Sequence, residues 1–554
     1  CPHCFVRGLR RILLVTGLPP IRCLGNHAHV VRNLPPPPDI PDNGSVGSNT
    51  TVNLHAGGMI GDSFDAGSPT GTSVNVMIHV VGGAAGDQFN ANGGSEVTIS
   101  GGVVGADFAA NGASSVYVSG GRVGDRSAAN ANSTVNISGG QVGNDFVATG
   151  SLVNITGGSV GNDYLALTNS GLQMSGGTLG FFLNAGAADG TSTNVDVFVS
   201  GGVLGPGIEV NAGAVMEFVG GLIRASSSFG IDWNFGSLGY IRGGIVDYAF
   251  DTFTGADVNI YGNDFFLGDD PLPIAGPTPV TIPSGQILSG ILADGTPFAL
   301  GEPLLDDTQP DTLTLHPAVL PPIGATVINV PPDVAPPSIR GGQTLNLFDT
   351  GELPNLFRAG PGSVVNISGG LARSGMEVRG ATIAFSGGSV GGDFVALFGS
   401  EVNITGGQIG PFANIIDSVV NLSGGRFGDA SQTTGNSVIN VSGGVLGDVF
   451  GLSLGSGGEA NFSGGIIHDL SAGSGTSVTI TGGEFLLDGQ PVVGLNTPGD
   501  SAAVNFSVAE DLVGVLADGT PFAFAKSNGF FNPASLTLNL VTLPAELVLL
   551  HHLR

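Results

Sequence analysis

Aspartates recur at one place in a repeated motif of this 554-residue chain, just after a Val-Gly or similar dipeptide. The series is Asp62, Asp87, Asp107, Asp125, Asp145, Asp163, Asp393, Asp429 and Asp448. If consecutive repeats stack, neighbouring carboxylates lie roughly 5 to 10 Å apart, and their like charges repel one another. Calcium prefers carboxylate oxygens and would relieve that repulsion. The pattern predicts a calcium ladder over Asp87, Asp107, Asp125, Asp145 and Asp163, with a solvated acidic face as the alternative.

Asparagines form a second series, in which each begins an N-x-S/T triplet. Its members are Asn136, Asn154, Asn366, Asn403, Asn421, Asn440 and Asn461. The triplet is a glycosylation acceptor in eukaryotic secreted proteins. Here the asparagine occupies the outward position of a repeated strand, so periodicity alone accounts for it. We therefore expect a stacked asparagine ladder, hydrogen-bonded from side chain to side chain.

Motifs of nucleophilic or redox chemistry are weak in this sequence. Cys1-Pro2-His3-Cys4 has the CxxC form, which is typical of thiol oxidoreductases and, with Cys23 and His27, of zinc sites. It lacks the preceding strand that a redox motif needs. The G-x-S-x-G text at Gly451–Gly455 has no strand-to-helix context. We assign no catalytic or cofactor-binding residue, and the chain is predicted not to be an enzyme.

Charge narrows the possible partners. Of the 16 basic residues, five are arginines in residues 1–38, whereas all 44 acidic residues lie beyond that segment. So acidic a surface repels phosphate backbones and anionic lipid, which argues against nucleic acid as a partner. No uninterrupted run of 18 apolar residues occurs, so no transmembrane segment is expected. Glycans and divalent cations remain compatible partners.

Paired glycines reveal the elements that position these side chains, because they recur about every 19 residues. One run opens at Gly82, Gly101, Gly120, Gly139, Gly157 and Gly176, and another at Gly369, Gly387, Gly406, Gly424, Gly443, Gly464 and Gly482. Before each pair, text such as Val135-Asn136-Ile137-Ser138 alternates apolar and polar residues, as a strand does. One such unit buries too little surface to fold alone, whereas stacked units share a continuous interior. The repeat predicts an all-β parallel β-solenoid, with a right-handed coil favoured.

A longer duplication sets the domain boundaries. Ile291–Leu300 returns almost unchanged as Val515–Phe524, after arrays of different length. We therefore expect two tandem solenoids, each closed by a small β-rich cap that protects its last strand edge. The predicted order is a basic leader or fragment end without stable structure (1–38), β-solenoid 1 (39–257), cap 1 (258–320), a Pro-rich linker (321–337), β-solenoid 2 (338–477), cap 2 (478–543) and a tail (544–554).

The Val-Asn-Ile-Ser-Gly-Gly repeat and the Leu-Ala-Asp-Gly-Thr-Pro-Phe block together resemble repetitive secreted β-solenoid proteins of aquatic bacteria. Some of these end in a Pro-Glu-Pro type sorting segment, which Leu543-Pro544-Ala545-Glu546 resembles in truncated form. The resemblance implies export and carries over no catalytic residue. It leads us to expect a non-catalytic structural or adhesive protein of a bacterial cell surface or extracellular matrix, with glycans or other surface components as partners. The alternative is a carbohydrate-active parallel β-helix, either a polysaccharide lyase or a hydrolase.

Overall fold

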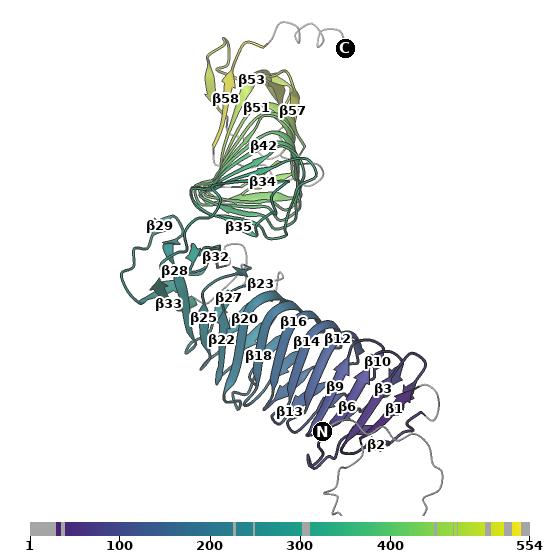
Figure 1. Ribbon diagram of the computed structural model, residues 1–554. Coiled ribbons are helices and arrows are strands. Elements are labelled where there is room, and N and C mark those ends of the chain that lie inside the picture. The colour runs from purple at the N-terminus through teal and green to yellow at the C-terminus, as the bar shows by residue number, and fades with distance from the viewer. Residues whose placement is uncertain are drawn as a thin grey trace, which may run out of the picture.

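The chain folds into stacked β-coils, as the repeat predicted (Figure 1). The computed structural model describes residues 29–34, 39–224, 229–247, 250–301, 311–447, 451–468, 470–473, 475–504, 511–525 and 535–543. Within these ranges every regular element is a β-strand. The leader motif Cys1–Cys4, Asp448 and the tail 544–554 lie outside the described residues.

A single coil shows why the motif has its form. In strand β14 (Thr134–Val142), Val135, Ile137 and Val142 are buried, and the side chains between them point outward or lie at the glycine pair. The strand bends at Gly139–Gly140, where Gly140 has a φ of 72°. A Cβ on Gly139 would lie 2.4 Å from the Ser119 carbonyl oxygen of the preceding coil. Glycine is therefore required at this corner.

Each coil is closed by a short strand on the opposite side of the core. Strand β15 (Val147–Thr149) follows the corner and buries Ala148, and Phe146 just before it is also buried. These two sides define a main sheet, which contains β14, and a second sheet, which contains β15.

Coils stack in parallel register. Strand β14 pairs with β12 (Ser115–Val123) through Val116 and Val135, and with β16 (Leu152–Val160) through Val135 and Val153. Equivalent apolar positions thus form columns along the interior, and the backbone groups of each coil bond to the coils above and below it.

Module 1 extends from β1 to β33. The parallel strands of its main sheet include the longer strands β1 (Val30–Leu34), β3 (Thr50–Leu54), β6 (Val76–Val80), β9 (Ser95–Ile99), β12, β14, β16, β18 (Gly171–Leu179), β20 (Val195–Leu204), β22 (Ala214–Phe218), β25 (Leu238–Ile241) and β28 (Asp257–Leu267), and the two-residue strands β4 (Met59–Ile60), β7 (Ala84–Ala85), β10 (Val103–Val104), β23 (Leu222–Ile223) and β26 (Ile245–Val246). Its 11-stranded second sheet comprises β2 (Ser45–Val46), β5 (Asp65–Ala66), β8 (Asn90–Ala91), β11 (Ala109–Ala110), β13 (Ala128–Asn130), β15, β17 (Tyr164–Ala166), β19 (Leu183–Ala185), β21 (Ile208–Val210), β24 (Ile231–Trp233) and β27 (Phe250–Thr252).

Module 2 repeats this plan with fewer coils. Its main sheet contains β34 (Val327–Val330), β36 (Thr344–Leu347), β39 (Val364–Ile367), β42 (Thr382–Val390), β44 (Glu401–Ile409), β46 (Val419–Leu422), β49 (Val438–Leu446), β51 (Glu459–Ile467) and β53 (Ser477–Leu487). Its eight-stranded second sheet contains β35 (Ser338–Ile339), β38 (Arg358–Ala359), β41 (Glu377–Arg379), β43 (Val395–Leu397), β45 (Asn414–Ile416), β48 (Ser431–Thr434), β50 (Leu452–Leu454) and β52 (Leu470–Ala472).

An antiparallel cap ends each module, and the duplicated block lies within it. In cap 1, β31 (Leu288–Leu292) pairs antiparallel with β28 and with β32 (Pro297–Leu300), and β33 (Asp311–Pro317) adds a last parallel layer on β28. The Asp294 carboxylate of the block accepts a 2.7 Å hydrogen bond from Gly244 N–H on the last coils, and Asp518 of cap 2 does the same for Gly465. The duplicated block thus fastens each cap to its solenoid through the same contact.

Two boundaries differ from those predicted. Strand β1 lies inside the predicted unstructured leader and pairs in register with β3. Strand β34 lies inside the predicted linker and pairs with β36, burying Ile328 and Val330. In both places a short segment next to prolines gains its backbone partners only from the next coil, so the sequence alone did not reveal the strand.

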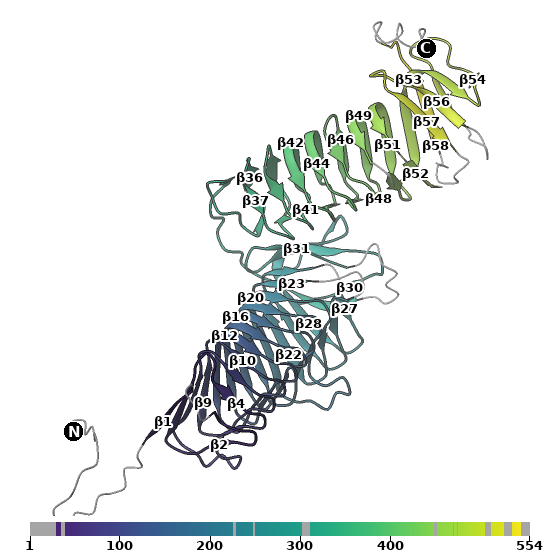
Figure 2. The ribbon, with the colours of Figure 1, turned by 90° about the vertical axis from the view of Figure 1, so that its right-hand side faces the viewer.

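The two modules are not coaxial, as Figures 1 and 2 show. Cap 1 packs against the flank of module 2, where Ile287 and Ala299 of the cap meet Leu397, Phe398 and Ile416. The handedness of the coils stays a prediction.

Candidate functional site

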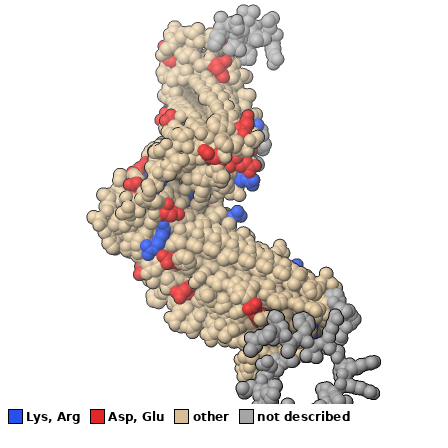
Figure 3. Space-filling view, viewed as in Figure 1, with Lys and Arg blue, Asp and Glu red and all other residues tan. Residues whose placement is uncertain are grey.

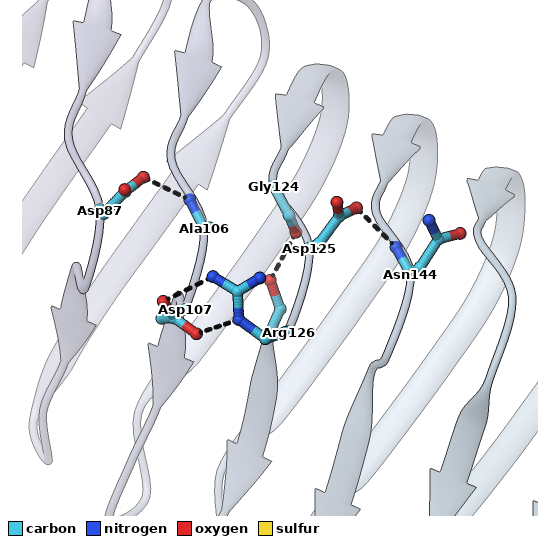
Figure 4. A network of polar contacts seen from close by, with 8 residues as sticks. Asp87, Ala106, Asp107, Gly124, Asp125, Arg126 and Asn144 are labelled. Carbon is cyan, nitrogen blue, oxygen red and sulfur yellow. Dashed lines mark hydrogen bonds and ion pairs between the residues drawn. The ribbon is translucent and has the colours of Figure 1, made fainter.

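The aspartates predicted as one ladder occupy two adjacent rows along module 1 (Figure 4). Asp87 and Asp125 directly follow the glycine of their motif and form the first row. Asp107, Asp145 and Asp163 stand one residue later and form the second row. Elsewhere, Asp62 and Asp429 hold first-row positions and Asp393 a second-row position.

First-row side chains bond to the backbone of the next coil. Asp87 Oδ1 accepts a 2.8 Å hydrogen bond from Ala106 N–H, and Asp125 Oδ1 accepts one of 2.9 Å from Asn144 N–H. A Cβ on Gly105 would lie 2.3 Å from Asp87 Oδ1. A side chain at position 105 would block this contact. Glycine is therefore required there so that the Asp87 carboxylate of the preceding coil can reach the backbone N–H of Ala106.

Second-row residues adopt the left-handed backbone conformation. Asp107, Asp145 and Asp163 have φ values of 58°, 58° and 62°, and Arg126 in the coil between Asp107 and Asp145 has 58°. Arg126 Nε lies 2.9 Å from Asp107 Oδ1, and this hydrogen bond lowers the pKa of Asp107. An arginine thus interrupts the predicted acidic series.

The part of the chain that the structure describes holds no group of three or more His, Cys, Asp or Glu side chains arranged to hold a metal ion. Calcium binding by the five predicted residues stays a prediction, but the contacts of Asp87, Asp107 and Asp125 favour the solvated acidic face that the sequence left as the alternative.

The asparagine ladder is confirmed, most extensively in module 2. Side-chain amides there donate to the preceding asparagine at 2.8 to 3.0 Å. The bonded pairs are Asn346–Asn329, Asn366–Asn346, Asn421–Asn403, Asn440–Asn421 and Asn461–Asn440. Exposed Ala384 interrupts the series between Asn366 and Asn403. In module 1, Asn154 donates to Asn136 at 2.8 Å.

Near its cap, module 1 replaces this ladder with chemistry that sequence reasoning missed. The aromatic patch, as we call it, comprises Phe198, Glu217, Tyr240, Arg242, Asn259, Tyr261 and His316 on the outer face of the main sheet. Four coils and the cap strand β33 contribute these residues.

Many charged residues on the face drawn in Figure 3 gather around the middle of the molecule, where the modules meet.

Three side chains form a stack at the centre of the patch. Arg242 Cζ lies 3.6 Å from the centroid of the Tyr261 ring, and the His316 ring lies 4.4 Å from Tyr261 on a plane inclined by 12°. Consecutive layers carry these residues, so the parallel stacking of strands brings the rings face to face.

Polar partners fix the two ends of the stack. Arg242 Nε donates to Glu217 Oε1 at 2.9 Å, and His316 Nε2 lies 2.7 Å from Asn259 Oδ1. Burial and the positive charge of Arg242 lower the pKa of His316. Asn259 Oδ1 is an acceptor, so Nε2 donates to it, and in the neutral imidazole that the lowered pKa favours, Nδ1 is an acceptor.

Module 2 provides an internal comparison. Because Asp294 and Asp518 fasten the two caps in the same way, the modules align from the cap inward. The counterparts of the patch are Asn421, Asn440, Asn461, Ser463, Thr479, Thr481 and Asn539, in the order given above. The patch is thus a feature of module 1 alone, and aligning the modules from their shared block would have found it.

The second sheet of module 1 carries a column of three carboxylates near the same end. Glu209, Asp232 and Asp251 hold equivalent positions on β21, β24 and β27. Burial first, then the charges of Asp251 and Glu209, raise the pKa of Asp232 to about 6. Exposed Phe229 and Phe253 lie next to this column in sequence.

Comparison with profiles of known families, with curated proteins and with solved structures finds no significant match to this chain. Among the described residues, no helix has the length and apolar character needed to cross a membrane.

Proposed function

We propose that this protein is a non-catalytic structural or adhesive component of a bacterial cell surface or extracellular matrix. The observation that carries the proposal is the pair of continuous cores, in which each coil is completed by its neighbours. Such an architecture extends a chain into stiff rods and displays repeated outer positions along them. The neutral asparagine ladder of module 2 supports a structural role, because its side-chain amides hydrogen-bond to one another and form no catalytic arrangement.

Antibody labelling of the producing cells tests this role. We expect intact, unpermeabilised cells to be labelled and the protein to be recovered with the envelope or matrix fraction. Labelling only after permeabilisation would contradict the proposal. An abundant periplasmic or cytoplasmic protein, probed in parallel, reports whether the cells stayed intact.

A carbohydrate-active enzyme is the second candidate, and Asp232 is the observation that favours it. A carboxyl group with a raised pKa beside two further carboxylates is an arrangement that glycoside hydrolysis uses for its general acid. This candidate predicts new chain ends on a polysaccharide substrate, and loss of that activity in Asp232→Asn. Asp196→Asn, on the outer face of the main sheet, is the matched control.

A further inference from the structure

We propose that the aromatic patch binds a neutral glycan laid along the rod of module 1. This inference deepens the adhesive role proposed above and rests on it. It assigns the ligand class to one face of one module.

Aromatic spacing carries the first step. Phe198 and Tyr240 lie on the same outward column, separated by the coil that carries Glu217. Two strand spacings put them roughly 10 Å apart along the rod, which is comparable with the length of a disaccharide. Phe198 is 40% exposed. Aromatic rings in such a row offer apolar faces to the C–H faces of successive sugars.

Polar groups beside the rings provide hydrogen-bond donors and acceptors for sugar hydroxyls. Glu217 accepts from Nε of Arg242, and the Tyr261 ring, itself stacked on His316, lies against the guanidinium, so the other N–H groups of Arg242 have a fixed direction. The neutral His316 contributes an acceptor at Nδ1. Because these donors and acceptors are preorganised by stacking, ordering them on binding costs little conformational entropy.

Charge selects a neutral ligand over an acidic one. The patch pairs its one cation, Arg242, with Glu217 at 2.9 Å. The whole chain carries a formal charge of -28. A polyanion approaching this surface is therefore repelled, whereas an uncharged polysaccharide is not.

Replacement in module 2 shows that the fold does not need these residues. The same positions there hold asparagine, serine and threonine, and the coils stack in the same register. The aromatic, cationic and imidazole groups at five of these seven positions are therefore an addition to the solenoid rather than a requirement of it.

Affinity electrophoresis of the full chain in gels containing neutral or acidic polysaccharides tests the proposal. The probes are a soluble β-glucan, xylan, mannan and dextran, with alginate and pectate as the acidic set. We expect retardation by at least one neutral polymer and by neither acidic one. In Phe198→Ala/Tyr240→Ala, we expect the dissociation constant for that polymer to rise about tenfold or more.

Tyr117→Ala is the matched control, because Tyr117 is an exposed aromatic on the same outward column but far from the cap. It should bind like the unaltered protein. Unchanged circular dichroism and melting temperature will show that the double variant is folded. Absence of retardation by every neutral polymer, or equal binding by the double variant, would overturn the assignment.

Cell labelling distinguishes failure of the glycan-site assignment from failure of the proposed surface role. A protein found on intact cells whose patch variant binds normally would leave the surface role standing and remove the glycan site. A protein confined inside the cell would remove the surface role whatever the gels show.

Discussion

The Arg358 guanidinium of module 2 donates a 2.8 Å hydrogen bond to the Val246 carbonyl oxygen of module 1. Arg358 is 2% exposed and also pairs with Glu377 at 3.1 Å. Strand β26 (Ile245–Val246) is thereby tied to β38 across the junction. This bond and the apolar contacts of cap 1 join the two modules.

Arg358→Ala should loosen the junction. The change removes the closer cation of Glu377, which is 14% exposed, and breaking a buried ion pair typically costs about 3 to 5 kcal/mol. We expect a lower free energy of unfolding in urea and a wider distribution of intramolecular distances by small-angle X-ray scattering. Arg373→Ala is the control, since the exposed Arg373–Glu352 pair should contribute about 0 to 1 kcal/mol. Equal effects of the two variants would show that the junction does not depend on Arg358.

Module 1 should lose stability as the pH rises through about 6. The pKa of Asp232 is raised by burial, by Asp251 and by Glu209, so protonated Asp232 favours the folded state. That stabilisation is complete below the ordinary aspartate pKa and disappears above about 6. Thermal melts from pH 4 to 7.5 should show this decline, and Asp232→Asn should flatten it. An equal or steeper decline in the variant would rule Asp232 out as the cause.

Ala384→Asn should stabilise module 2. The substitution joins the two asparagine series that end at Asn366 and Asn403, adding up to two side-chain hydrogen bonds at an exposed position. Each typically contributes about 0.5 to 1.5 kcal/mol. Urea unfolding should report the gain, and Thr382→Asn, outward on the same strand, serves as the comparison. A destabilised Ala384→Asn variant would mean that the ladder does not support the stack.

Gly105→Ala should destabilise module 1. Its Cβ would lie 2.3 Å from Asp87 Oδ1 and 2.6 Å from the Gly86 carbonyl carbon, so the coils must separate locally. Overpacking of this kind costs about 1 to 3 kcal/mol. Gly47→Ala is the control, because a Cβ there meets nothing within 4 Å. If both variants melt at the same temperature, the coils are not in the contact described.

Removal of calcium should leave the melting temperature unchanged. Backbone N–H groups engage Asp87 and Asp125, and Arg126 neutralises Asp107, so the carboxylates have partners other than a metal. Melts in EDTA and in millimolar calcium test this expectation. A rise in calcium that Asp145→Asn abolishes would instead establish the predicted calcium ladder.

The coil was predictable because its determinants are local. Alternation at Val135 and Ile137 and the bend at Gly139 are visible within one repeat, so strand, corner and stacking all follow from the sequence. Strand β34 was missed because its four residues lie among prolines and gain their partners only from β36.

The sites were harder to predict, because stacking brings distant residues together. Arg242 and Tyr261 meet because β25 pairs with β28, whereas His316 lies much further along the chain and joins them only when the cap strand β33 pairs with β28. The two aspartate rows follow from a one-residue offset that was visible in the text, since Asp87 directly follows Gly86 whereas Asp107 follows Ala106. Only the structure shows that the first-row aspartates accept hydrogen bonds from the backbone of the next coil, whereas the second-row aspartates have a left-handed backbone conformation.

Incubation of the full chain with the polysaccharide panel, scoring retention and new chain ends in the same samples, tests the account most directly. The account predicts retention of the protein on a neutral polymer with no new reducing or unsaturated ends. New ends that disappear in Asp232→Asn would contradict it and identify the protein as a carbohydrate-active enzyme.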